Sequence, residues 1–219
     1  MPASLPEYLV RSPSESSIAA DFYARIDQLR GAPLADRADL EAQIWAEYGV
    51  EKAVLALDMS HFSLYVRRNG ILAYLGLIRE MQLLATPLVE ASAGHVVKCE
   101  ADNLMALFDT PAQAIQAAAT IHGALENRAA RVGDRALEVS IGIDFGRILW
   151  IRGADCFGDS VNLAYKLGED LAHSGETLLS DRARVMLPAS LPYPLEELRM
   201  SISGLEFMVY RVVYTPRPA

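Results

Sequence analysis

Hydrophobic residues recur every three or four positions in two segments before residue 50, and this spacing is typical of amphipathic helices. The first helix is expected to end near Arg30 and the second near Gly49. We therefore predict that residues 1–50 form a helical appendage and that residues 51–219 form one larger domain. The appendage either covers that domain or regulates it.

From residue 51 onward, short apolar runs typical of strands alternate with segments of helical spacing. We expect strands at 51–58, 137–143, 147–151, 176–179, 197–200 and 207–213, and a hairpin at 96–108. We expect helices at 111–127 and 159–172, and a long helical region at 61–92 with an early interruption at Asn69-Gly70. Residues 144–146 would form a turn between two paired strands. This order predicts an α+β fold of ferredoxin-like type, a mixed or antiparallel sheet with its helices packed on one face.

Composition narrows the possible classes of protein. Hydrophobic residues make up 52% of the chain and charged residues 22%, so a packed globular core is expected. The formal net charge of −8 argues against a nucleic-acid-binding surface. No apolar run approaches the roughly 18 residues of a membrane span, and the start of the chain lacks the features of a signal peptide. Two distant cysteines are expected to be reduced thiols in a cytoplasmic protein.

Two aspartates lie at the ends of predicted strands. Asp58 closes the first strand, and Asp102 lies at the hairpin turn, four residues after Lys98. Two strand-end carboxylates with a nearby cation are what a two-metal phosphoryl-transfer site needs.

A second group of polar residues lies on the helix expected at 159–172. Asn162 and Lys166 are four residues apart, so an amide and a cation point from the same helix face. The amide is expected to face the interior, and together the two groups suit an anionic transition state.

Five stretches in the same order carry a family resemblance. They are LALDMSHFS, GHVVKCEADNLMALFDTPAQAIQAA, VSIGIDFGRIL, DCFGDSVNLAYKLGEDLAHSGETLLS and ISGLEFMVYRVV. From about Val54 to Val213 the chain resembles the class III adenylate/guanylate cyclase homology domain. The resemblance implies that residues 51–219 are a catalytic domain.

The resemblance also implies a metal site and a site that reads the base. Asp58 and Asp102 would bind two Mg²⁺ or Mn²⁺ ions, with the backbone carbonyl of Met59 as a further ligand. Lys98 and Asp155 hold the two base-reading positions, where lysine with aspartate is the adenine-selecting pair and guanylate cyclases carry glutamate and cysteine.

Asn162 would orient the ribose and Lys166 would stabilise charge on the transferring phosphate. In this family the sites form in a head-to-tail homodimer, with the metal-binding aspartates from one chain and the other site residues from its partner. The implied enzyme is an adenylate cyclase, a phosphorus–oxygen lyase of signal transduction that converts ATP to 3′,5′-cyclic AMP and pyrophosphate.

Three residues depart from the family pattern. Lys166 stands where arginine is usual, Ala101 replaces a turn glycine whose role Asn103 could take, and Glu100 adds a carboxylate. Glu100 would either lie in the outer shell of the metal site or form a salt bridge with Lys98. Two alternative functions follow: a cyclase that prefers GTP or a pyrimidine triphosphate, and a weakly active, cyclase-like module for nucleotide binding and dimerisation.

Overall fold

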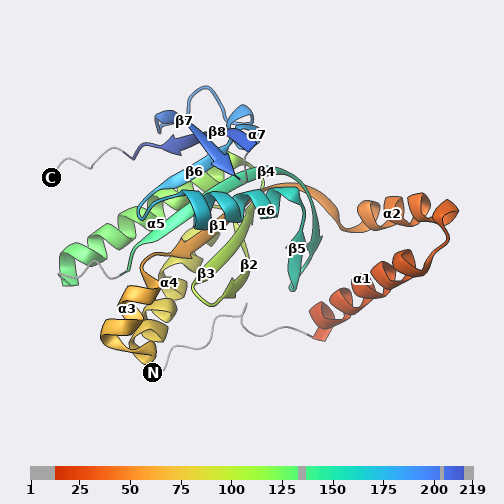
Figure 1. The fold of residues 1–219 in the computed structure, drawn as a ribbon, viewed down its shortest axis with the longest axis horizontal. Coiled ribbons are helices and arrows are strands. Elements are labelled where there is room, and N and C mark those ends of the chain that lie inside the picture. The colour runs from red at the N-terminus through yellow and green to blue at the C-terminus, as the bar shows by residue number, and fades with distance from the viewer. Residues whose placement is uncertain (1–12, 133–136, 203–204, 215–219) are drawn as a thin grey trace.

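A computed structural model of the chain describes residues 13–132, 137–202 and 205–214 (Figure 1). Its helices are α1 Pro13–Gly31, α2 Leu34–Tyr48, α3 Phe62–Asn69, α4 Ile71–Ala91, α5 Pro111–Val132, α6 Asp159–Tyr165, the π-helix η2 Lys166–Leu171 and α7 Asp181–Val185. Its strands are β1 Gly49–Met59, β2 His95–Glu100, β3 Asn103–Phe108, β4 Val139–Ile151, β5 Asp155–Phe157, β6 Thr177–Ser180, β7 Leu195–Ile202 and β8 Leu205–Val212.

One mixed sheet organises the domain. Its strand order is β2-β3-β1-β4-β6-β8-β7, and β5 pairs with β4 away from this path. The β4–β6 pair is parallel and the other pairs are antiparallel. The predicted α+β fold class with a mixed sheet is therefore confirmed.

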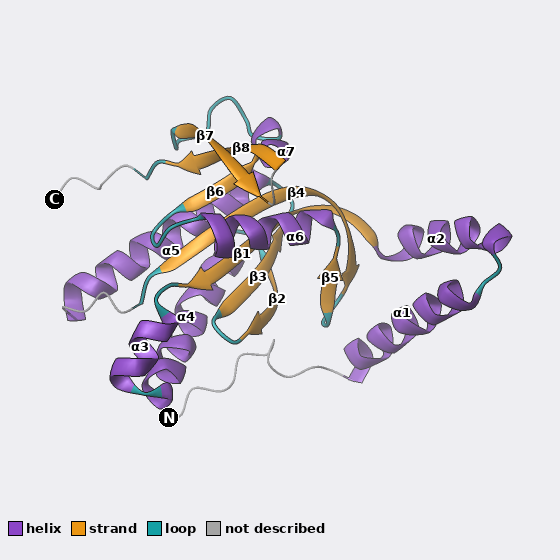
Figure 2. Ribbon diagram, viewed as in Figure 1, coloured by secondary structure: helices purple, strands orange, loops and turns teal. Residues whose placement is uncertain are grey.

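Helices cover both faces of this sheet, so the expectation that they lie on one face was wrong. Leu55 and Leu57 of β1 pack with the buried side chains of α4 and α5, whereas Val54 and Ala56 pack with α6. Figure 2 shows α6 in front of the sheet and α5 behind it. Every position of the run 53–57 is buried, as expected for a strand covered on both faces.

The predicted turn at 144–146 was also wrong, because β4 runs unbroken through it for 13 residues. Asp144 is fully buried within the strand, where Ser180 and Arg182 supply its hydrogen-bond donors. A Cβ atom on Gly146 would come within 2.4 Å of Ser160 Oγ. The glycine therefore permits the close approach of α6 and does not mark a turn.

The helix expected at 159–172 is two elements, α6 and the π-helix η2. Both lie directly on the sheet. A Cβ atom on Gly142 of β4 would come within 2.0 Å of the Ala164 carbonyl oxygen, and one on Gly168 within 2.9 Å of the Ala56 carbonyl oxygen. These two glycines therefore allow α6 and η2 to lie close to the backbone of the sheet.

The two N-terminal helices match their prediction and form an antiparallel pair that projects from the sheet (Figure 1). Phe22 of α1, Ile44 and Tyr48 of α2 and Ile151 of β4 share one buried cluster. The division at residue 50 stays a prediction, and residues 1–12 lie outside the described part.

Helix α4 is 21 residues long and, by length and composition, apolar enough to cross a membrane, which the sequence analysis did not anticipate. Its buried face belongs to the main core, through Tyr74, Leu77, Met81, Ala85 and Val89. A helix of the core of a soluble protein passes the same test, so this finding is weak support for a membrane span.

A buried histidine on α5 makes stability depend on pH. Burial lowers the pKa of His122 to about 4, and its Nε2 lies 3.1 Å from Thr177 Oγ1. In the unfolded chain the imidazole takes up a proton near its ordinary pKa of 6.5, whereas in the folded protein it stays neutral. The free energy of unfolding should therefore fall by about 2 kcal/mol between pH 7 and pH 5 through this group.

Urea unfolding of wild type and of His122→Gln at both pH values isolates this effect, because other titrating groups are common to both. The wild type should lose about 2 kcal/mol more than the variant on acidification. Equal losses would show that His122 is not the group responsible.

Candidate active site

Two carboxylates lie together where β1 ends and β3 begins. Asp58 faces Asn103 across the antiparallel β1–β3 pair, and Asp102 lies in the turn just before Asn103. The Met59 backbone N–H donates to the Asp102 carbonyl oxygen at 3.2 Å, which fixes the turn against the end of β1. The hairpin predicted from the sequence therefore brings Asp58 and Asp102 to the same edge.

Burial and neighbouring negative charges at this edge disfavour the ionised form of Asp58. The pKa of Asp58 is raised to about 7, first by burial and then by the negative charges of Asp102 and Glu169. Tyr74 donates its hydroxyl to Asp102 Oδ2 at 3.0 Å. Burial, together with this bond and the charges of Asp102 and Asp58, raises the pKa of the Tyr74 hydroxyl, so Tyr74 is a neutral donor near pH 7.

The donor set at this edge fits a hard divalent cation. Within the described ranges no three His, Cys, Asp or Glu side chains form a group that could hold a metal ion, and this edge offers the two carboxylates of Asp58 and Asp102. Mg²⁺ is commonly bound through one or two carboxylates, with water and substrate phosphates completing its shell. A cation would also offset the repulsion that raises the pKa of Asp58.

Lys98 of β2 and Asp155 of β5 are in contact although 57 residues separate them. Lys98 Nζ donates to Asp155 Oδ2 at 3.0 Å, and both side chains are about 70% buried. The Cys156 backbone N–H donates to Asp155 Oδ1 at 2.8 Å and so orients the carboxylate. The two residues assigned to base reading thus form one cation–carboxylate pair.

Glu100 forms a salt bridge with Lys98, which is one of the two alternatives stated for it. Its Oε2 lies 3.4 Å from Lys98 Nζ. Burial lowers the pKa of Lys98, but the bonds and charges of Asp155 and Glu100 outweigh it and leave that pKa raised. Lys98 therefore remains charged between two carboxylates.

Asn162 and Lys166 are exposed, so the expectation of an interior-facing amide was wrong. They lie one turn apart, since the Lys166 backbone N–H donates to the Asn162 carbonyl oxygen where α6 ends. Among the residues that the structure describes, neither side chain has a hydrogen-bond or ion-pair partner. Both are free to meet another molecule.

Comparison with known proteins shows which sequences and folds this chain resembles. No protein-family model matches the chain. It is 30% identical over 131 residues to a Rhizobium meliloti (strain 1021) protein named "Putative adenylate cyclase 3", a match that covers 59% of this chain and 22% of that protein. An uncharacterized protein of Mycobacterium tuberculosis (strain ATCC 25618 / H37Rv) is 30% identical over 131 residues, a match that covers 60% of this chain and 33% of that protein. The chain thus spans about a fifth to a third of the curated relatives it matches.

Solved structures extend the likeness to about three quarters of the chain. The adenylate/guanylate cyclase/hydrolase from Silicibacter pomeroyi aligns with a TM-score of 0.66 and 27% identity, over 76% of this chain and 98% of that one. The chain has the fold of a class III cyclase homology domain. The guanylate cyclase domain of RhGC from Catenaria anguillulae, in complex with GTP, aligns with a TM-score of 0.64 and 16% identity, over 74% and 96% of the chains. The cyclase fold therefore does not separate ATP from GTP.

Sequence reasoning missed two residues at the carboxylate edge of the cyclase domain. Tyr74 lies within the helical segment expected at 61–92 and was not singled out there, and Glu169 of the π-helix η2 comes near Asp102. The pKa of Glu169 is raised by burial and by Asp170 and Asp102, although a hydrogen bond from Asn103 lowers it. Helical spacing assumes 3.6 residues per turn, so it gave no signal for Glu169.

The hairpin turn of the cyclase domain holds an alanine in a left-handed conformation. Ala101 has φ of 49°, so Ala101 itself adopts the positive φ that the turn requires, and Asn103 does not. This conformation costs roughly 1–2 kcal/mol for a residue with a Cβ atom. Ala101→Gly should therefore raise the free energy of unfolding by about 1 kcal/mol, measured by urea denaturation.

Ala93, with φ of 58° beyond the end of α4, is a matched control for this substitution. Ala93→Gly should stabilise the protein by a similar amount without touching the site. If Ala101→Gly destabilises while Ala93→Gly stabilises, the turn at Ala101 is held by something other than its backbone preference.

Proposed function

We propose that the protein is a nucleotidyl cyclase, a phosphorus–oxygen lyase that converts ATP to 3′,5′-cyclic AMP and pyrophosphate. The observation that carries this proposal is the pairing of Asp58 with Asp102 at one edge of a cyclase fold. In this proposal residues 51–219 are the catalytic domain and residues 1–50 its helical appendage. We place its action in the cytoplasm, where thiols such as those of Cys99 and Cys156 stay reduced.

Asp58 and Asp102 would hold two Mg²⁺ or Mn²⁺ ions, with the Met59 backbone carbonyl as a further ligand. Bound there, the ions would lower the pKa of the ribose 3′-hydroxyl and hold the triphosphate for in-line attack. The chain itself contributes the alignment. Tyr74 and the Met59 N–H hold Asp102 in place by hydrogen bonds of 3.0 and 3.2 Å.

Lys98 and Asp155 would read the base. Together they offer one cationic donor and one carboxylate acceptor, already in contact at 3.0 Å and oriented by the Cys156 N–H. A purine edge supplies the complementary acceptor and donor groups. The resemblance to adenine-selecting cyclases favours ATP.

Asn162 would orient the ribose and Lys166 would stabilise charge on the phosphate. Both side chains are exposed and without partners in the described part of the chain. This supports a head-to-tail homodimer, in which they reach the metal-binding aspartates of the partner chain. A single chain would then be inactive.

Two observations favour different functions. Glu100, 3.4 Å from Lys98, places a second acceptor beside the base-reading pair, which favours a cyclase that accepts GTP or a pyrimidine triphosphate. Lys166 lacks the planar fork that grips phosphate oxygens in two places, which favours a weakly active nucleotide-binding or dimerisation module.

A product assay distinguishes these functions. The purified protein is incubated with Mn²⁺ and separately with ATP, GTP, CTP or UTP, and cyclic products are resolved by chromatography. Cyclic AMP as the main product supports the proposal. Another cyclic nucleotide keeps the mechanism and refutes the base assignment, and no product from a dimeric protein favours the module.

Lysine at position 166 should limit the rate of the reaction. Because arginine can contact two phosphate oxygens at once, Lys166→Arg should raise kcat about fivefold, or about 1 kcal/mol of additional transition-state stabilisation. Lys52→Arg is the control, since Lys52 pairs with Asp109 away from the site. An unchanged or lower kcat in Lys166→Arg would show that the native lysine is not limiting.

A further inference from the structure

A buried carboxylate on β4 lies at the centre of a polar network outside the candidate active site. Asp144 is fully buried, and its oxygens accept hydrogen bonds from Ser180 Oγ and from the guanidinium of Arg182. Ser180 Oγ also accepts the Ala183 backbone N–H at 3.0 Å, which caps α7. The network therefore fixes the start of α7, and Arg182 with it, against β4.

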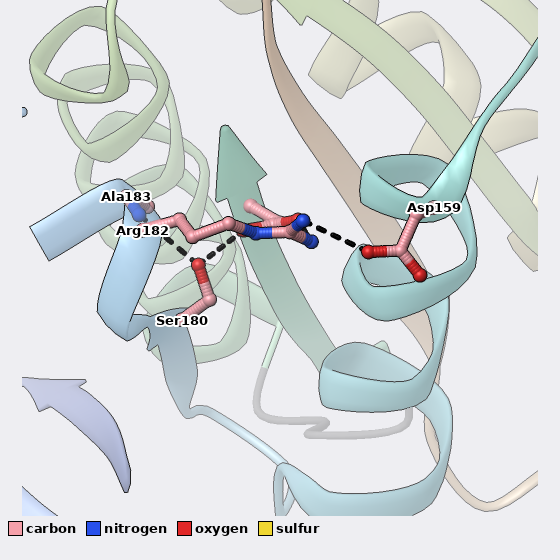
Figure 3. A network of polar contacts seen from close by, with 5 residues as sticks. Asp159, Ser180, Arg182 and Ala183 are labelled. Atoms are coloured by element: carbon pink, nitrogen blue, oxygen red, sulfur yellow. Dashed lines mark hydrogen bonds and ion pairs between the residues drawn. The ribbon is translucent and has the colours of Figure 1, made fainter. Parts of the chain in front are cut away.

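The same arginine reaches across to the helix that carries Asn162 and Lys166. Arg182 Nη1 lies 2.8 Å from Asp159 Oδ2 in the first turn of α6. Figure 3 shows the guanidinium between Ser180 and Asp159, with the two helices on opposite sides. Burial lowers the pKa of Arg182, but its bonds to Asp144 and Asp159 outweigh this and raise it, so the link stays charged.

Helix α6 packs on the sheet through Ser160 and Val161 of its first turn, and the Arg182–Asp159 pair is a polar contact beside that packing. The helix is seven residues long, and its N-cap Gly158 offers no side-chain hydrogen bond. A helix this short is not stable on its own and depends on tertiary contacts. Asn162 follows Asp159 by three residues, so a shift of the first turn moves Asn162 directly.

We propose that Arg182 and Asp159 form a positioning pair that fixes α6 so that Asn162 and Lys166 meet the substrate correctly. This inference rests on the proposed function for its catalytic consequence. The Arg182–Asp144 and Arg182–Asp159 contacts have different effects. The buried Arg182–Asp144 half stabilises the fold, because an unpaired buried carboxylate is costly.

The Arg182–Asp159 half contributes little to global stability, because the side chains are 46% and 80% exposed. Its effect is local, on the position and opening of α6. A variant that removes only this half should therefore leave the protein folded and change α6.

Asp159→Asn tests this directly, with Asp159→Glu as the conservative rescue. Asp181→Asn is the matched control, since Asp181 is an exposed acid in the first turn of α7. We expect α6 amides of Asp159→Asn to exchange with solvent about fivefold faster, and kcat to fall about fivefold with KM unchanged. Asp159→Glu should restore both quantities, and Asp181→Asn should change neither.

Unchanged α6 exchange in Asp159→Asn would overturn the proposal, as would faster exchange with an unchanged kcat in an active enzyme. A kcat loss that Asp159→Glu does not rescue would overturn it too. The exchange measurement needs no turnover. If the wild type made no cyclic nucleotide, the proposed function would fail while the tie between Arg182 and α6 was still tested.

Discussion

Asp102→Asn should abolish cyclic nucleotide formation and leave the fold intact. Asp102 is one of the two carboxylates of the proposed metal site, and metal ions bound there would stabilise transition-state charge by several kcal/mol. Losing about 4 kcal/mol corresponds to a kcat about 1000-fold lower. Asparagine keeps an oxygen that can accept the hydroxyl of Tyr74, so the thermal unfolding midpoint should change little.

Asp109→Asn is the control. Asp109 comes directly after β3, whereas Asp102 comes directly before it, and Asp109 pairs with Lys52 away from the proposed metal site. Isothermal titration calorimetry with Mn²⁺ measures metal affinity and supplies a readout besides turnover. The Asp102→Asn variant should bind Mn²⁺ far more weakly than Asp109→Asn. Turnover within tenfold of wild type in Asp102→Asn would refute the metal assignment.

Lys98→Ala should lower kcat/KM for ATP by about 10- to 100-fold, because hydrogen bonds to charged groups contribute about 1.5–3 kcal/mol. The variant removes the cationic half of the pair with Asp155, and it leaves Asp155 and Glu100 without the charge between them. Mn²⁺ affinity should not change, since Lys98 is no metal ligand. Initial rates at varied ATP and GTP provide the measurement.

A double variant tests selection of the base rather than binding in general. Lys98→Glu with Asp155→Cys installs the residues of guanylate cyclases, and should raise the ratio of GTP to ATP turnover. Lys52→Ala is the control, as another lysine paired with a carboxylate. If Lys98→Ala and Lys52→Ala have equal effects, or if the double variant keeps the wild-type ratio, Lys98 and Asp155 do not read the base.

The parts of the fold that the sequence predicted are those governed by local pattern. Helical spacing placed α1, α2, α4 and α5, and the turn residues near Asp102 placed the β2–β3 hairpin. The fold class followed from the order of these elements. The hairpin also led to the correct conclusion that Asp58 and Asp102 lie close together.

The errors arise where tertiary contacts override a local signal. Asp144 and Gly146 look like turn residues, but the aspartate is buried against Arg182 and the glycine makes room for Ser160. Neither partner can be inferred from neighbours in the sequence. The apolar run at 53–57 did carry the information that helices cover both faces, because alternation is absent from it.

The site divides in the same way. Lys98 and Asp155 were paired through family motifs, and their contact at 3.0 Å is a matter of sheet topology that no spacing predicts. Asn162 was expected inside because its helix is otherwise apolar, yet it is exposed. In the proposed homodimer Asn162 would face the partner chain, and such a residue resembles a core residue in sequence because both lie on an apolar helix face.

The division of the active site between two chains is the central claim, and mixing two inactive variants tests it most directly. Asp102→Asn lacks a metal ligand and Asn162→Ala lacks the ribose contact, so each homodimer should be inactive. In a 1:1 mixture about half of the dimers are heterodimers with one intact site of two, so about a quarter of wild-type activity should return. Mixing Asp102→Asn with Asp58→Asn should restore nothing, because both substitutions fall in the same half-site. No recovery in the first mixture, with heterodimers verified by two affinity tags, would contradict the shared site.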